Sequence, residues 1–242
     1  MLNAPLDTYA DQFKKDGFLI VPHLFTAHEM IRLKSEIAAI LAKLQTGEIG
    51  DSDGKQWKML KASGVYVGLA PHSNLIQRLL RDDRLLDILE VMIGPNLEFL
   101  SDKIAYKDDD TDHPSPWHQD WPYWYGDHKI SVWVALDDAT VDNGCLKLIP
   151  GSHHGMATHD GEDDGKGFGN RLKQEAVDES QAVTASVERG GAVFFHDLAL
   201  HASHSNTAQT DRWVWIPTYR DAQHNDPDYP FAIANTVVRG HR

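Results

Sequence analysis

Apolar residues in the first part of the chain recur mostly at helical spacing, with one short exception. Residues 8–16 predict a short helix that ends near Gly17. The apolar residues of 18–22 follow without interruption until the final proline, a pattern typical of a short strand that stops there. The chain therefore begins with one helix and one strand.

A longer helix is predicted after Thr26. This threonine can cap a helix, and Glu29 stands three residues later, which is the spacing of a capping box. The apolar positions that follow share one helical face: Met30, Leu33, Ile37, Ile40, Leu41 and Leu44. Residues 73–93 predict one or two further helices, broken near Asp82 and closed by Gly94 and a proline.

Short apolar runs bounded by turn residues dominate the chain from residue 97 onward. These predicted strands are 97–100, 103–106, 132–136, 146–149, 192–195 and 213–216. Helices followed by many short strands favour a mainly β fold, with helices packed outside a sandwich or barrel. We therefore expect one domain over 1–242, helical over about 1–95 and with a β core over about 97–220.

Two polar segments interrupt this pattern. Residues 46–56 are rich in glycine and polar side chains, and they predict either a mobile loop near the functional site or a plain surface connection. Residues 153–180 carry many Gly, Asp, Glu and His residues without periodicity. A long insertion of this kind is often a lid over a site.

Composition narrows the classes of partner. Among 242 residues, 41% are hydrophobic and 24% are charged, which is ordinary for a globular protein. The net charge of −13 would repel a phosphate backbone, so we expect no nucleic acid as a partner. No apolar run approaches the length that spans a bilayer, and the N-terminal residues lack the regions of a signal peptide. We expect no membrane segment and a cytoplasmic location.

Cysteine content removes two further possibilities. The chain has one cysteine, Cys145, which excludes an intramolecular disulfide and a zinc site built from several cysteines. A small buried apolar role is the simplest interpretation of this residue.

Histidine and aspartate residues supply the candidate chemistry. His118 and Asp120 are two positions apart, so on an extended strand both side chains point to the same side. With His201 as third ligand they would form the two-histidine, one-carboxylate set that holds Fe(II) and leaves coordination positions open. A second His-x-Asp match, 224–226, is followed by prolines, and we interpret it as a loop.

An arginine is predicted beside this metal. If a turn centred on 206–207 joins strands 192–195 and 213–216 as an antiparallel pair, His201 lies opposite Arg212. A keto acid with a second carboxylate, such as 2-oxoglutarate, could then chelate iron and meet the guanidinium. Ser203 shares the strand face of His201 and could add a hydroxyl. Alternatively, Arg212 simply pairs with a nearby acid such as Asp211.

Several ordered motifs give the chain a family resemblance. They are Asp16-Gly17-Phe18-Leu19-Ile20-Val21-Pro22, Trp117-His118-Gln119-Asp120, Asn143-Gly144-Cys145-Leu146, Ile149-Pro150-Gly151-Ser152-His153, and His201-x-Ser203 with Arg212 eleven residues after the histidine. Together they resemble the phytanoyl-CoA dioxygenase family of Fe(II)/2-oxoglutarate oxygenases, and the resemblance covers most of the chain.

The resemblance implies a fold, a reaction and a set of site residues. The fold would be a double-stranded β-helix, also called a jelly roll, which is cupin-like. The cofactors would be Fe(II), 2-oxoglutarate and O2, and the enzyme would hydroxylate an unactivated carbon with succinate and carbon dioxide as co-products. Lys103, Gln119 and Trp133 match positions that bind cosubstrate or line the site in relatives, although each could be structural.

The substrate stays open at this level. Aromatic residues surround the metal motif and could form a substrate wall or merely pack in the core: Trp117, Trp121, Tyr123, Trp124 and Tyr125. A small amine, an amino acid, a natural-product intermediate or an acyl thioester is compatible with the sequence, and so is any oligomeric state. Two alternatives compete with the oxygenase: a cupin-like metalloenzyme that does not use 2-oxoglutarate, and a non-catalytic binding protein on the same fold.

Overall fold

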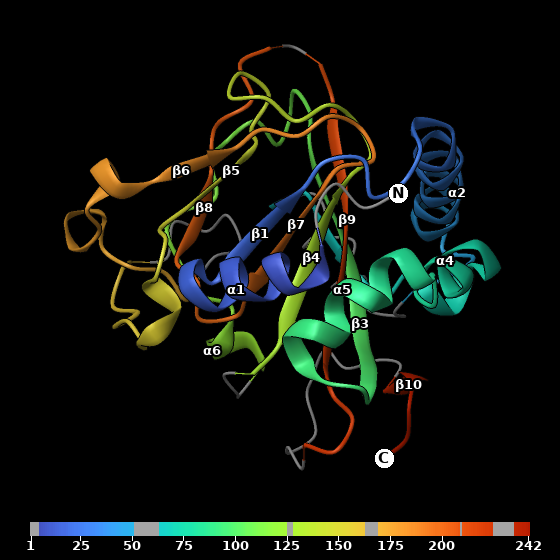
Figure 1. Ribbon diagram of the computed structural model, residues 1–242. Coiled ribbons are helices and arrows are strands. Elements are labelled where there is room, and N and C mark those ends of the chain that lie inside the picture. The colour runs from blue at the N-terminus through green and yellow to red at the C-terminus, as the bar shows by residue number, and fades with distance from the viewer. Residues whose placement is uncertain (1–4, 51–62, 125–127, 163–168, 209, 225–234) are drawn as a thin grey trace.

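Helices cover one side of a central sheet in the computed structural model (Figure 1), which describes residues 5–50, 63–124, 128–162, 169–208, 210–224 and 235–242. The longer helices are α1 (Leu6–Asp16), α2 (Ala27–Gln45), α4 (Asn74–Leu79) and α5 (Asp83–Ile93). The remaining helical elements are α6 (Trp121–Trp124), η1 (Ala70–His72), η2 (Ser152–His154), η3 (Gln174–Ala176) and η4 (Glu179–Gln181).

Local signals set the helix ends where the sequence predicts them. Gly17 closes α1 with a left-handed φ of 78°. Thr26 and Glu29 form the expected capping box, in which the Glu29 N–H donates to the Thr26 hydroxyl at 3.2 Å and the Thr26 N–H donates to the Glu29 carboxylate at 2.7 Å. Asp82 caps α5, so the predicted break between α4 and α5 is confirmed.

The strands form two antiparallel sheets. They are β1 (Phe18–Val21), β2 (Val65–Val67), β3 (Leu97–Lys107), β4 (Ile130–Ala135), β5 (Leu146–Leu148), β6 (Val183–Ala185), β7 (Ala192–His196), β8 (His201–Ser203), β9 (Arg212–Asp221) and β10 (Thr236–Arg239). The larger sheet has the order β1-β7-β4-β9-β3-β10, with β2 also paired to β3. The smaller sheet has the order β6-β5-β8.

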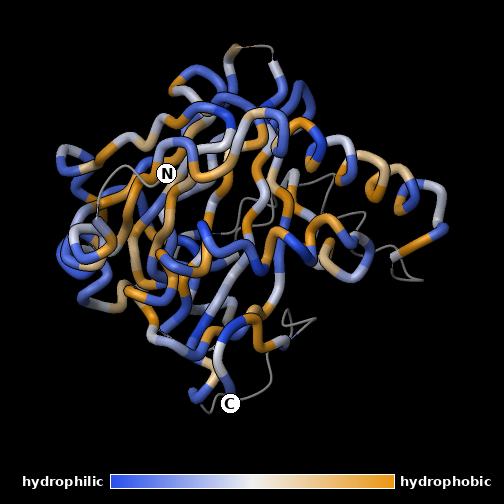
Figure 2. The backbone as a smooth tube through the Cα atoms, turned by 45° about the vertical axis from the view of Figure 1, so that its right-hand side comes forward, coloured by the Kyte–Doolittle hydropathy of each residue, from blue (hydrophilic) through white to orange (hydrophobic). Residues whose placement is uncertain are grey.

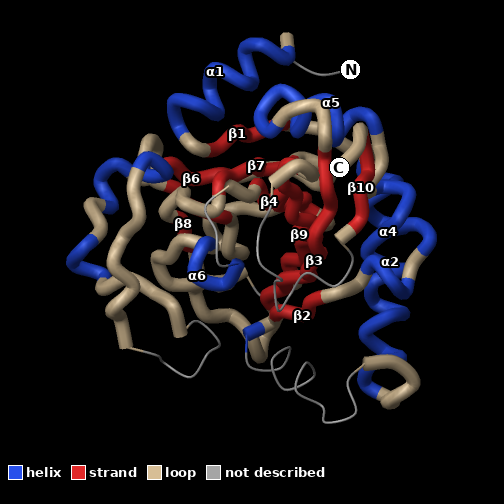
Figure 3. The backbone as a smooth tube through the Cα atoms, turned by 90° about the horizontal axis from the view of Figure 1, so that it is seen from below, coloured by secondary structure: helices blue, strands red, loops and turns tan. Residues whose placement is uncertain are grey.

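Alternation along the strands divides the core into two layers. On β4, Val132 and Val134 belong to the cluster that packs against the helices, whereas Trp133 and Ala135 belong to the cluster shared with the smaller sheet. Figure 2 shows hydrophobic segments gathered along the central strands, and Figure 3 shows the helices around the outside of the strands. The expected jelly-roll architecture with flanking helices is confirmed, and the functional cavity described below opens on the sheet-to-sheet side.

The predicted pairing of 192–195 with 213–216 is wrong. Strand β4 lies between β7 and β9, so these two strands are not paired with each other. His201 lies on β8 in the smaller sheet, opposite Leu148, while Arg212 lies on β9 opposite Lys107. The physical reason is that the chain crosses from one sheet to the other after β7 and crosses back after β8, so residues 206–207 are not the tip of a hairpin.

The first 95 residues contribute more than helices, because β1 and β2 both join the larger sheet. Part of the predicted loop 46–56 lies outside the described residues. Within the described part of the chain, no helix has the length and hydropathy needed to cross a bilayer.

The capping box should contribute measurably to stability. Replacing Thr26 by Ala removes the side chain that accepts the Glu29 N–H. We expect the free energy of unfolding to fall by about 1 kcal/mol in urea denaturation. Ser35 is the matched control, because its hydroxyl donates to the Ile31 carbonyl in the middle of the same helix. Ser35→Ala should change stability by less than about 0.5 kcal/mol, and an equal loss in both variants would contradict the capping role.

Candidate active site

Reciprocal backbone hydrogen bonds place the predicted metal ligands side by side. The His118 N–H donates to the His201 carbonyl, and the His201 N–H donates to the His118 carbonyl, both at 3.0 Å. The Asp120 N–H donates to the carbonyl of Asp197 at 2.8 Å, in the turn that leads into β8. His118 forms an isolated bridge rather than a long strand, but the extended backbone still turns His118 and Asp120 to one side, as predicted.

The three side chains form a compact ligand set. The Nε2 atoms of His118 and His201 lie 3.7 and 3.8 Å from Oδ1 of Asp120. The potential ligand atoms all lie within 4.8 Å of one another, and all three residues are buried. Within the described residues this is the one group of three or more His, Cys, Asp or Glu side chains that could hold a metal ion.

Backbone carbonyls fix the orientation of both imidazole rings. Nδ1 of His118 is 2.8 Å from the Pro116 carbonyl oxygen, and Nδ1 of His201 is 2.9 Å from that of Ala199. Because a carbonyl oxygen only accepts, each Nδ1 carries a proton and each Nε2 presents a lone pair toward the metal position. The donor set, two imidazole nitrogens and one carboxylate oxygen, fits Fe(II) with open coordination positions.

Electrostatics favours the protonation states that a metal requires. Burial, followed by the neighbouring His201, lowers the pKa of His118 to about 3, and burial also lowers the pKa of His201. Burial opposes ionisation of Asp120, but attraction to the neighbouring Lys103 ammonium leads the causes that outweigh it and lower the pKa of Asp120 to about 2. At neutral pH the imidazoles are therefore neutral and the carboxylate is ionised.

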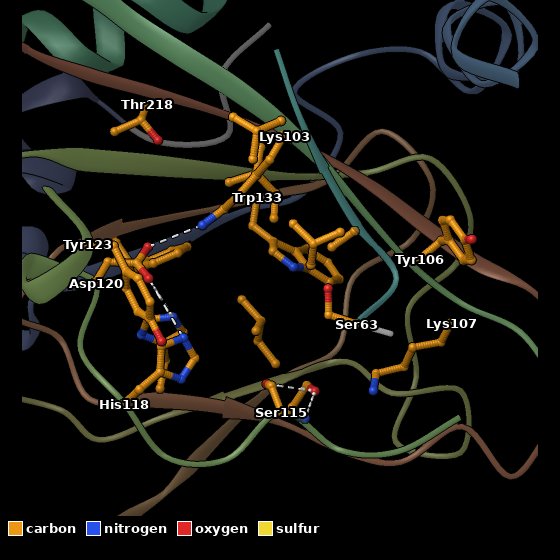
Figure 4. Close-up of a pocket in the computed structure, with 18 of the residues that line it drawn as sticks. Ser63, Lys103, Tyr106, Lys107, Ser115, His118, Asp120, Tyr123, Trp133 and Thr218 are labelled. Carbon is orange, nitrogen blue, oxygen red and sulfur yellow. Dashed lines mark hydrogen bonds and ion pairs between the residues drawn. The ribbon is translucent and has the colours of Figure 1, made fainter. Parts of the chain in front are cut away.

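Lys103 fixes the second oxygen of the carboxylate. Its ammonium lies 3.5 Å from Oδ2 of Asp120, whereas Oδ1 faces the two histidines (Figure 4). One oxygen is thus directed to the metal position and the other to the lysine.

A cavity of about 220 Å³ opens beside the ligand set. Besides the three ligands, its wall includes the predicted site residues Lys103, Tyr123, Trp133, Ser203 and Arg212. Other lining residues come from several strands and loops: Ser63, Val65, Val67, Tyr106, Ser115, Leu146, Phe195 and Ile216. The contribution of β2 to the cavity was not predicted from the sequence, although its Val-Tyr-Val run alternates between more and less buried positions as a strand should.

Arg212 is a buried cation without an acidic partner among the described residues. Its side chain is 3% exposed, its Nη1 donates to the Ala105 carbonyl at 3.4 Å, and its Nε has no hydrogen-bond partner. The guanidinium lies 5.4 Å from the ring centre of Trp133. Burial lowers the pKa of Arg212 to about 10. The alternative pairing with Asp211 is not formed, so the arginine is available to an anion in the cavity.

Two further predicted residues face the cavity with defined geometry. The Ser203 hydroxyl accepts hydrogen bonds from the Ser115 N–H and the Ser115 hydroxyl, both at 2.9 Å, which leaves its own proton to donate. Tyr123 meets the ring of His118 edge-on, with 6.4 Å between ring centres.

Other predicted site residues lie elsewhere. Gln119 is completely buried and does not line the cavity, because its side chain points to the opposite side of the metal-binding segment. Trp121 also lies outside the cavity wall and donates its indole N–H to Gln119 at 3.1 Å. Trp124 ends α6, and its side chain lies outside the described part of the structure. None of the described residues of 153–180 lines the cavity, so a lid there stays a prediction.

Comparison with known proteins decides the family. The model of the family described as phytanoyl-CoA dioxygenase (PhyH) matches residues 13–214, which is most of the chain. This protein belongs to the phytanoyl-CoA dioxygenase family. The matched range includes all three ligands and Arg212.

The curated proteins that are similar in sequence to this PhyH-family chain include oxygenases named for small molecules. L-proline trans-4-hydroxylase of Streptomyces griseoviridis is 27% identical over 251 residues, which cover 95% of this chain and 91% of that protein. An ectoine dioxygenase of Halomonas elongata is 26% identical over 84% of this chain and 66% of its own length.

Solved structures share the fold of this PhyH protein. The non-heme monooxygenase ThoJ superposes with a TM-score of 0.72 at 23% identity, covering 97% of this chain and 84% of that one. EvdO2 of Micromonospora carbonacea var. aurantiaca, complexed with 2-oxoglutarate, has a TM-score of 0.68 at 21% identity and covers 95% of this chain and 96% of that one.

Family membership and the ligand set define the enzyme class. The protein is an iron- and 2-oxoglutarate-dependent dioxygenase. This conclusion excludes the two alternatives considered from the sequence, a cupin-like metalloenzyme without 2-oxoglutarate and a non-catalytic binding protein.

Removing any predicted ligand should abolish tight metal binding. We expect His118→Ala, Asp120→Ala and His201→Ala each to weaken Fe(II) binding at least about 100-fold in anaerobic titration, because each leaves two protein ligands. His204→Ala is the control, since His204 follows His201 closely in the chain but does not line the cavity. Wild-type affinity in any of the three ligand variants would contradict the assignment.

Proposed function

We propose that this dioxygenase hydroxylates an unactivated carbon of a small-molecule substrate, with His118, Asp120 and His201 holding iron and Arg212 holding 2-oxoglutarate. One observation carries the assignment of roles. A buried guanidinium without an acidic partner among the described residues faces the same cavity as the three metal ligands. Burying an unpaired charge is unfavourable, so an anionic ligand that neutralises it would bind strongly.

When bound, a ferrous ion and 2-oxoglutarate would supply oxygen activation coupled to oxidative decarboxylation, with succinate and carbon dioxide as co-products. The protein residues provide position and environment. His118 and His201 present Nε2 lone pairs and Asp120 presents Oδ1, so these three residues would hold an iron ion through two imidazole nitrogens and one carboxylate oxygen.

Two polar side chains complement Arg212. The Ser203 hydroxyl has a proton to donate and lines the same cavity, so it can add a hydrogen bond to the carboxylate far from the metal. Lys103 holds Oδ2 of Asp120, and its ammonium also faces the cavity, where it can meet the cosubstrate. Trp133 supports the guanidinium through its ring face.

Apolar walls protect the chemistry from water. Phe195, Leu146 and Ile216 line the cavity between the sheets, and Val65 and Val67 of β2 line it as well. A dry wall strengthens the electrostatic attraction between charged groups inside the cavity. Tyr123, which contacts the ring of His118, is the aromatic residue that we assign to substrate contact.

The substrate is proposed to be small. A cavity of about 220 Å³ must hold part of the substrate together with the cosubstrate. The relatives named for L-proline and ectoine act on compact molecules, which supports a substrate of similar size. A polyanionic acyl thioester of coenzyme A is disfavoured by the net charge of −13. Among the classes left open by the sequence, an amino acid or a small amine fits best.

Cosubstrate turnover tests the proposed reaction. Anaerobic addition of Fe(II) and then 2-oxoglutarate should give a weak visible charge-transfer band, and admission of oxygen should release succinate. A panel of amino acids and small amines should then increase succinate release for the true substrate class, with a hydroxylated product detected by mass spectrometry. A folded, iron-loaded protein that gives neither band nor succinate would contradict the proposal.

Arg212 should control affinity for 2-oxoglutarate. Arg212→Gln removes the cation, and we expect the KM for 2-oxoglutarate to rise at least about 30-fold, since losing one partner of a buried charge pair costs about 2–5 kcal/mol. Arg189 is the matched control, because it pairs with Asp137 and does not line the cavity. Arg189→Gln should leave this KM within about twofold, and an unchanged KM in Arg212→Gln would show that the anion binds elsewhere.

A further inference from the structure

The metal-binding segment 117–121 has two faces with different partners. His118 and Asp120 point into the cavity, whereas Gln119 between them points away from it, as an extended backbone requires. The Gln119 side chain is nevertheless completely buried. A buried amide must find hydrogen-bond partners, so its contacts indicate what this residue holds together.

Every polar atom of the Gln119 amide is used. The NH2 group donates to the Gly155 carbonyl at 2.8 Å and to the Leu198 carbonyl at 2.6 Å. The amide oxygen accepts from the Ala157 N–H at 2.8 Å and from the Trp121 indole at 3.1 Å. An amide side chain offers two donors and two acceptor positions, so the set is complete.

These bonds join the two chain segments that carry all three ligands. Leu198 lies in the turn that leads to His201, and the Ala199 carbonyl in the same turn holds Nδ1 of the His201 ring. Gln119 lies between the other two ligands. The amide therefore spans from the His118–Asp120 segment to the turn that positions His201.

The insertion supports the same segment from outside. Nε2 of His159 accepts the backbone N–H of Gln119 at 3.1 Å, while its Nδ1 meets the Ala157 carbonyl at 3.0 Å. Farther along the insertion, the Leu172 N–H donates to the Trp117 carbonyl at 2.9 Å, and Glu179 accepts the Trp117 indole N–H at 3.0 Å. The described part of 153–180 thus packs behind the metal ligands rather than across the cavity.

We propose that Gln119 is a positioning residue of the iron centre. Its amide sets the distance between the His118–Asp120 segment and the His201 turn, and the insertion holds that amide in place through Gly155 and Ala157. The inference rests on the ligand assignment proposed above. Partners that orient metal ligands without touching the metal typically contribute about 10–100-fold to metal affinity.

Cobalt affinity measures this role directly. Gln119→Met is nearly isosteric and removes all four amide hydrogen bonds. We expect the Kd for Co(II), measured by anaerobic titration on the folded protein, to rise about 10–100-fold, with a changed visible spectrum because the ligand geometry relaxes. A residue that only stabilises the fold would lower the melting temperature and leave both readouts unchanged.

Asn143→Leu is the matched control. Asn143 is also buried, accepts from the Thr140 N–H and donates to the Asp138 carbonyl, both at 2.8 Å, and does not line the cavity. The Asn143→Leu variant should be less stable than the wild type but keep the wild-type Kd and visible spectrum for Co(II). An equal loss of cobalt affinity in both variants would overturn the inference, because it would reflect general destabilisation.

A milder variant keeps the test decisive if Gln119→Met does not fold. His159 is only partly buried, and His159→Phe removes the acceptor for the Gln119 N–H while keeping an aromatic ring. It should weaken Co(II) binding, whereas His154→Phe, at an exposed position of the same insertion, should not. Equal affinities in these two variants would overturn the inference.

Two outcomes separate this inference from the proposed function. If the wild-type protein binds no Co(II), or His118→Ala binds it as the wild type does, the ligand assignment itself fails. If the ligand variants lose Co(II) but folded Gln119→Met keeps the wild-type Kd and spectrum, only the positioning role of Gln119 fails.

Discussion

The reciprocal backbone hydrogen bonds between His118 and His201 are the constraint on which the site depends. They join two segments that are distant in the chain and bring imidazoles from both to one carboxylate. The turn before β8 adds a second tie through the Asp120 N–H, and carbonyls of Pro116 and Ala199 fix the rings. Together these backbone contacts orient the ligand atoms toward one another.

Charge burial is the second organising feature. Asp120 keeps its charge because the Lys103 ammonium lies beside it, and the imidazoles stay neutral because they are buried. Arg212 forms no ion pair with a described acidic residue, and the longer-range attraction of Asp137 only partly offsets its burial. An iron ion would balance the charge of the Asp120 carboxylate, and a carboxylate of the cosubstrate would balance the charge of the Arg212 guanidinium. The charges that line the cavity therefore match the cofactors of the family.

Local sequence patterns predicted the elements well where short-range physics decides them. The capping box at Thr26 and Glu29, the left-handed closure at Gly17 and the break at Asp82 all depend on residues within one helical turn of each other. The predicted neighbours of His201 failed for the opposite reason. The prediction assumed that two strands close in sequence pair as a hairpin. The chain instead crosses between two sheets, so β8 pairs with β5, which is distant in the sequence.

The donor atoms and their alternation could be predicted from the order of residues alone, because residue type and the two-residue period of an extended backbone fix which side chains share a face. That alternation predicted His118 and Asp120 as a pair, whereas His201 joined them through the ordered family motifs and through a hairpin that does not form. The prediction that Arg212 lies beside the metal rested on the wrong strand pairing, and it is the packing of the two sheets that brings Arg212 from β9 to the cavity. Packing also supplies the backbone groups of the insertion and of the turn before β8 that the Gln119 amide binds. These contacts join residues that are far apart in the chain, so they depend on how the two sheets and the insertion pack together and not on local sequence.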